Sequence, residues 1–145
     1  MSKDRTMSLQ ALIKYAIAGR SNKKAVHHFF VVSKHKVNLL KKRGKDITGF
    51  KHSIDSYAIK HILINHGDNN TEKKRGLVAI TLDRFYLIPS ILKNPDEIKI
   101  VKRNNKIFFV YKKQYKDEII YVEEVLMGRK ELATKTMYIK KTRKK

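Results

Sequence analysis

The chain contains no cysteine, few acidic residues and no apolar run long enough for a membrane span. Without cysteine it can form neither disulfides nor thiolate zinc sites, and it offers no cysteine nucleophile. Its longest apolar runs, residues 29–32 and 107–111, have the length of strands rather than the roughly 20 residues of a membrane helix. The N-terminus also lacks the basic-then-apolar layout of a signal peptide. We therefore expect a soluble chain with no membrane span.

Two further absences narrow the possible chemistry. The glycines are isolated, so no glycine-rich loop of the Walker type is present to hold a nucleotide phosphate. Glu123 and Glu124 are adjacent in a predicted strand and therefore point to opposite faces, which argues against the paired carboxylates of glycosidases and two-metal nucleases. We expect neither nucleotide hydrolysis nor a metal site, and we predict no cofactor.

Positive charge dominates what remains. The chain has 145 residues, the size of one domain with a single core, and its 34 Lys and Arg against 13 Asp and Glu give a net charge of +21. Such an imbalance is typical of proteins whose partner is a polyanion that releases counterions on binding. Nucleic acid is the first candidate. Solubility alone, an anionic membrane surface or an acidic partner protein are the alternatives.

The N-terminal third carries little recognisable chemistry. Apolar residues at helical spacing predict a helix over residues 9–17, ending before Gly19. Residues 28–32 have the composition of a strand, and helical periodicity resumes over residues 36–42 until Arg43 and Gly44.

A better-marked helix carries two histidines. Ser53 can cap it, Gly67 follows its last residue, and the limits are therefore residues 54–66. His61 lies at the edge of the apolar arc and His66 lies within it. His66 also occupies the last turn, where the negative end of the helix dipole favours an imidazolium. His66 is therefore a candidate acid.

The middle of the chain joins a polar loop to a further helical segment. Residues 68–75 are polar and basic, so we expect a mobile surface loop. Thr81 is a candidate cap for a helix over residues 82–92, within which Pro89 must begin a new turn.

The C-terminal part reads as an antiparallel meander. β-Branched and aromatic residues predict four strands with short polar connections, which force neighbouring strands to run antiparallel. With the preceding helices packed on one face of this four-stranded antiparallel sheet, the predicted class is α+β. The strands are expected over residues 98–101, 107–111, 119–125 and 132–139.

The last strand combines hydroxyls with a cation. In a regular strand Thr134, Thr136 and Tyr138 share one face, and we place Lys135 on the inward face with Ala133, Met137 and Ile139. Lys135 and Thr136 then reach the same phosphate only if a bulge or the sheet edge intervenes.

Three blocks of sequence carry a family resemblance. They are Gly49-Phe50-Lys51-His52-Ser53-Ile54-Asp55 with Ile59-Lys60-His61 and His66-Gly67; Ile80-Thr81 with Asp83, Ile88-Pro89 and Pro95-Asp96; and Val122-Glu123-Glu124-Val125 with the run from Arg129 to Tyr138. In order and spacing they resemble the phage-type branch of the barnase, EndoU, colicin and RelE-like ribonuclease superfamily. The resemblance spans roughly residues 31–140. It implies a ribonuclease domain over residues 31–145, preceded by a helical extension over residues 1–30.

The resemblance also implies an activity and its residues. Members are toxin or phage-associated endoribonucleases that cut RNA, often tRNA, without metal. RNA supplies its own nucleophile, the ribose 2′ hydroxyl, so the product would end in a 2′,3′-cyclic phosphate. We expect His61 to act as general acid or base and His66 to assist, with Lys135, Thr136 and Tyr138 around the scissile phosphate. The residues expected to bind RNA are Thr134, Arg129, Lys60, Lys73, Lys74 and Arg75.

A toxin of this kind needs an inhibitor and a target cell. The resemblance and the net charge together imply an acidic immunity or antitoxin protein as partner, and action in the bacterial cytoplasm. Two other readings stay open: a noncatalytic RNA- or DNA-binding module that uses the basic tail from Lys140 and the loop at residues 73–75, and an inactive domain that serves assembly in a larger phage protein.

Overall fold

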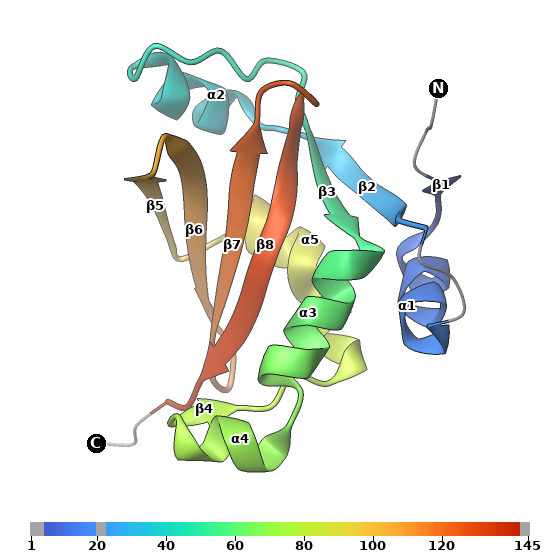
Figure 1. The fold of residues 1–145 in the computed structure, drawn as a ribbon. Helices are drawn as coiled ribbons and strands as arrows, with labels where there is room; N and C mark the ends of the chain where they lie inside the picture. Colours follow the sequence, from blue (N-terminus) through green and yellow to red (C-terminus); the bar gives the residue numbers. More distant parts are fainter. Residues whose placement is uncertain (1–4, 20–22, 143–145) are drawn as a thin grey trace.

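The fold was obtained as a computed structural model, which describes residues 5–19 and 23–142. Figure 1 shows helices gathered around a strongly twisted sheet. The helical elements are α1 (Leu9–Ala18), α2 (Lys34–Lys41), α3 (Ser56–His66), α4 (Asn69–Lys74), the 3-10 helix η1 (Leu82–Leu87) and α5 (Ile88–Lys93). The strands are β1 (Arg5–Thr6), β2 (Ala25–Val31), β3 (Lys51–Asp55), β4 (Leu77–Val78), β5 (Glu97–Arg103), β6 (Lys106–Gln114), β7 (Glu118–Leu126) and β8 (Glu131–Lys140).

Within the described residues the strands form one mixed, eight-stranded sheet. Its order is β1-β2-β3-β8-β7-β6-β5, and β4 pairs with the far end of β8. The meander from β5 to β8 is antiparallel, whereas β3 runs parallel to β8 and β1 parallel to β2. The long strand β8 therefore lies in the middle of the sheet, between β3 and β7.

The predicted α+β class and the C-terminal meander are confirmed. The predicted sheet had four strands, however, whereas the sheet of the described residues has eight. Short turns connect the strands of the meander. In the turn between β5 and β6, Asn104 and Asn105 both adopt positive φ, as a tight two-residue hairpin turn requires. β1 and β4 are only two residues long, too short to show any periodicity. β3 was read as the start of a helix, because it runs without a break into α3.

The helix ends follow local capping chemistry. Asp55, rather than the expected Ser53, caps α3 by accepting a hydrogen bond from the Ala58 amide at 2.7 Å. Ser53 lies inside β3, so the predicted start of this helix was two residues early. α1 ends at Gly19 with φ of 60°, as predicted.

The main core lies on one face of the sheet. Aromatic residues of β6 and β7, including Phe109, Tyr111 and Tyr121, are buried there against η1, α3 and α5. In Figure 1, α5 passes behind the strands of the meander. None of the helices in the described part of the chain is long and apolar enough to cross a membrane. The opposite face of the meander is left half-exposed, and it is called the open face below.

Candidate functional site

The register of the strands defines which residues share the open face. Directly paired residues on neighbouring strands point to the same side of a sheet. One row across the sheet contains His28, Ser53, Ala133, Glu124, Phe108 and Val101. Two further rows contain Thr136, Val122, Val110 and Lys99, and Tyr138, Ile120, Lys112 and Glu97. The open face therefore combines imidazole, hydroxyl, aromatic and cationic groups.

A β-bulge in β8 changes the predicted faces of the last strand. Val122 pairs with Thr136 and Glu123 pairs with Thr134, so Lys135 is the extra residue. The bulge places Thr134 on the core side together with Met137, while Thr136 and Tyr138 stay on the open face. The predicted grouping of Thr134 with Thr136 was wrong, because it assumed unbroken alternation. Lys135 was expected to point inward, and it is exposed instead.

Thr134 is engaged in the interior. Its hydroxyl donates to the Ser53 carbonyl at 2.9 Å and accepts a hydrogen bond from the Tyr121 hydroxyl. Only 8 % of Thr134 is exposed. Thr134 thus ties β8 to β3 and β7, and its expected contact with RNA stays a prediction.

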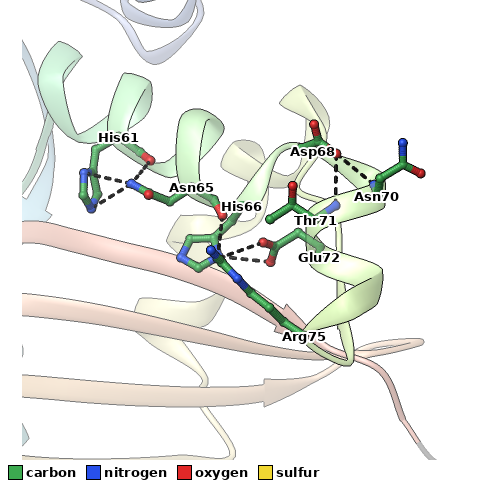
Figure 2. Close-up of polar contacts among 8 residues, drawn as sticks. All are labelled: His61, Asn65, His66, Asp68, Asn70, Thr71, Glu72 and Arg75. Carbon is green, nitrogen blue, oxygen red and sulfur yellow. Dashed lines mark hydrogen bonds and ion pairs between the residues drawn. The ribbon is translucent and has the colours of Figure 1, made fainter.

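The structure brings His66 and Tyr138 together at the C-terminal end of β8. Their ring centroids are 5.7 Å apart, and the His66 Nδ1 lies 3.0 Å from the Glu72 Oε2. Figure 2 shows that Arg75 also reaches this carboxylate, with 3.3 Å between its Nη1 and the Glu72 Oε1. Because Glu72 holds Nδ1, the free Nε2 of His66 is the nitrogen available to exchange a proton. A carboxylate that orients an imidazole is the usual support of a general acid or base.

Glu72 belongs to a segment that was expected to be a mobile loop. Residues 69–74 instead form α4, which Asp68 caps through the amides of Asn70 and Thr71. The Glu72 side chain is fully buried, between His66 and Arg75. Sequence reasoning missed it, because a single buried carboxylate in a polar segment leaves no periodic signal.

His61 lies apart from this cluster. It is exposed, and the Asn65 amide nitrogen lies 3.1 Å from its Nδ1 (Figure 2). Five residues of helix separate His61 from His66, which corresponds to about 7.5 Å along the axis and about 140° around it. Of the two helix histidines, His66 is the one held by a carboxylate.

The Thr136 hydroxyl has no protein partner. Its Oγ1 is buried and makes no hydrogen bond to the described residues. A buried hydroxyl without a partner is costly, and such groups in native proteins call for an explanation. A ligand bound on the open face would supply one only after the Thr136 side chain rotates, because the Oγ1 has almost no exposed surface in this structure.

The remaining predicted RNA-binding cations do not form one cluster, because Arg129 lies at the opposite end of β8 from Tyr138. Lys73 and Lys74 are exposed on α4, Lys60 is half-exposed on α3, and Arg129 lies in the turn before β8. Lys140 and Lys141 lie close to the end of the described chain at Thr142, and the rest of the basic tail, residues 143–145, lies outside the described residues.

A second histidine–carboxylate pair on the open face was not predicted. The His28 Nε2 lies 2.8 Å from the Glu131 Oε1, and the Ser53 hydroxyl approaches the Glu131 Oε2 at 3.5 Å. The pair joins β2 to the start of β8 across 103 residues of sequence, so no local pattern could reveal it.

A third polar cluster is closed off in the core. The Lys36 ammonium donates to the Leu92 carbonyl at 2.8 Å and to the His52 Nε2 at 3.3 Å, and the Tyr111 hydroxyl donates to Glu123 at 2.6 Å. Burial lowers the pKa of Lys36 to about 8, although the nearby Glu123 carboxylate acts in the opposite direction. Burial and the same carboxylate raise the pKa of Tyr111. Because the polar groups of this cluster are buried and hydrogen-bonded to protein groups, we interpret the cluster as structural.

An open groove of about 850 Å³ lies beside the buried cluster, between α2 and the connection from α5 to β5. It is lined by Phe30, His35, Leu39, Lys93 and Asp96, among others. None of the predicted site residues lies in this groove. In the described part of the chain, His, Asp and Glu side chains form no group of three or more that could hold a metal ion.

The fold is an α+β protein whose open sheet face carries both polar and apolar side chains, with lysines and glutamates together. Comparison with family models identifies the class. A model described as phage-Barnase-EndoU-ColicinE5/D-RelE like nuclease3 matches residues 30–145, and the chain belongs to this nuclease family. No curated protein and no solved structure matches the chain. The resemblance stated from the sequence is thereby confirmed, and nucleic acid is the class of substrate.

Proposed function

We propose that the chain is a metal-independent endoribonuclease that holds the scissile phosphate on the open face, beside His66. The observation that carries this proposal is the position of the His66 imidazole between the Glu72 carboxylate and the Tyr138 ring. The cluster lies at one end of a cation-bearing sheet face in a member of a nuclease family. RNA is the favoured substrate, because attack by its own 2′ hydroxyl lets acid–base groups alone cleave the chain by transesterification.

The proposed reaction needs few groups. The His66 Nε2 takes the proton of the 2′ hydroxyl, the 2′ oxygen attacks phosphorus, and the bond from phosphorus to the 5′ oxygen breaks. The products are a 2′,3′-cyclic phosphate and a 5′ hydroxyl, whose oxygen takes up a proton. Lys135 and Arg75 offset the negative charge that builds on the phosphoryl oxygens, and the Thr136 hydroxyl donates a hydrogen bond to one of them.

The roles of the two helix histidines differ in this proposal. His66 is the acid–base group, because Glu72 fixes its ring and tautomer. His61 remains a candidate for the second proton transfer, and Tyr138 is a candidate ligand of the phosphate. Lys60, Lys73 and Lys74 are proposed to bind the RNA backbone around the site, and Arg129 is proposed to bind it at the other end of β8.

The biological setting is also a proposal. A substrate among tRNAs, a toxin role in the bacterial cytoplasm and an acidic immunity or antitoxin partner follow from the resemblance, and the net charge of +21 favours an acidic inhibitor.

Cleavage of tRNA in the presence of a chelator tests the activity. Wild type is expected to produce fragments that end in 2′,3′-cyclic phosphate, and His66→Ala should reduce the rate by about 100-fold or more. His35→Ala is the matched control, since His35 is an exposed histidine on α2, away from the open face. His61→Ala in the same assay decides whether His61 takes part. Equal rates for His66→Ala and wild type would refute the assignment.

The rival function is noncatalytic RNA binding. The rows of the open face favour it, because Phe108 and Tyr138 offer rings for base stacking, with Lys99 and Lys112 nearby. Salt-sensitive binding of tRNA without any cleavage would support the rival and contradict the nuclease.

A further inference from the structure

A half-exposed histidine–carboxylate pair marks the other end of β8. His28 and Glu131 expose 29 % and 18 % of their side chains, so solvent and ligands can reach both. Both Glu131 oxygens are engaged, one by the His28 imidazole and one by the Ser53 hydroxyl. The carboxylate thus fixes the ring from β2 on the open face.

The arrangement determines what the imidazole offers to a ligand. A carboxylate only accepts hydrogen bonds, so the His28 Nε2 carries the proton and donates it to Glu131. In the neutral ring the Nδ1 is then an acceptor, suited to an amino or imino group of a nucleobase. Lys51 is paired with Glu131 in the register and is exposed, which adds a cation suited to phosphate.

The distance from the His66 cluster sets the role of this pair. Seven residues of extended strand separate Glu131 from Tyr138, which corresponds to about 20 Å. One ribose-phosphate link cannot contact both ends. An RNA strand that follows β8 can contact both, because they lie on the same face of the same strand.

We propose that His28 and Glu131 form a second subsite, which binds a nucleotide of the RNA strand distant from the scissile link. His28 is the contact residue, Glu131 positions it, and Lys51 binds the neighbouring phosphate. The proposal deepens the proposed nuclease function and rests on it. His28 precedes the matched residues 30–145, so the segment before the family domain completes the subsite.

Substrate length provides the kinetic test. His28→Ala should raise the KM for an RNA of about ten nucleotides by roughly tenfold, which corresponds to about 1.4 kcal/mol, and leave kcat unchanged. Cleavage of a dinucleotide, which is too short to reach the subsite, should be unaffected. Glu131→Gln should give a smaller change in the same direction. His27→Ala is the matched control, because His27 neighbours His28 on β2 but pairs with Ile54 on the other face.

Two kinetic outcomes would overturn the subsite. An equal loss on the dinucleotide and the longer RNA would assign His28 to catalysis or folding, and unchanged kinetics on both would leave it without a role.

A binding measurement separates this proposal from the nuclease proposal. Fluorescence anisotropy with the same ten-nucleotide RNA requires no cleavage when both proteins carry His66→Ala. The variant with His28→Ala in addition should bind about tenfold more weakly. If wild type cuts no RNA but this difference appears, the nuclease proposal fails and the subsite stands. If RNA is cut and the two proteins bind equally, the subsite fails alone.

Discussion

His52 donates a hydrogen bond from its Nδ1 to the Glu123 Oε2 over 2.7 Å, with both side chains fully buried. The Lys36 ammonium can only donate, so the His52 Nε2 that faces it must be the acceptor and Nδ1 must carry the proton. Glu123 accepts from Tyr111 through its other oxygen. One carboxylate on β7 therefore satisfies donors from β3 and β6, and it joins β3 to the meander.

Removing this carboxylate should destabilise the protein strongly. Glu123→Ala leaves the donors of His52 and Tyr111 without an acceptor and the Lys36 ammonium without a countercharge. The free energy of unfolding, measured by urea denaturation, should fall by about 3–5 kcal/mol. Glu124→Ala is the control, because this neighbouring residue is half-exposed on the open face and should cost less than about 1 kcal/mol. A similar fall in unfolding free energy for both variants would contradict a stabilising role of the buried network.

The pH dependence of stability should reveal Lys36. Burial lowers its pKa from the ordinary 10.5 to about 8, so between these values the unfolded chain binds a proton that the folded protein does not. Stability then rises with pH across this window. Relative to Lys36→Met, the unfolding free energy of wild type should gain up to about 3 kcal/mol between pH 8 and pH 10.5. Parallel pH profiles of the two proteins would contradict the lowered pKa.

How far the sequence predicted this molecule depends on whether the signal was local. α1 and the four strands of the meander were predicted, because apolar periodicity and turn residues act over a few positions. The bulge at Lys135 was not predicted, since it arises from the pairing of β8 with β7. The role of the buried Glu72 was missed because its partner His66 lies on the other side of a helix junction. The pair of His28 and Glu131 was missed because the two residues are distant in the chain.

The bulge separates the roles of two threonines. Thr134→Val removes bonds to the Ser53 carbonyl and the Tyr121 hydroxyl, and should cost about 1–3 kcal/mol of stability without slowing RNA cleavage by the folded protein. Thr136→Val removes a hydroxyl that has no partner among the described residues, so stability should stay level or rise. If Thr136 binds the phosphate, kcat should fall by about 100-fold. The opposite pattern, measured by urea denaturation and RNA cleavage, would reverse the two assignments.

Gly67 connects the geometry of α3 to the His66 cluster. A methyl group on Gly67 would lie 2.4 Å from the Leu63 carbonyl oxygen, so the last turn of α3 must shift to admit it. Gly67→Ala should lower the unfolding free energy by about 1–3 kcal/mol and displace His66 from Glu72 and Tyr138, with a loss of kcat on RNA. Gly128→Ala is the matched control, because a methyl group there meets nothing within 4 Å. If Gly67→Ala equals Gly128→Ala in stability and in cleavage, the end of α3 does not set the position of His66.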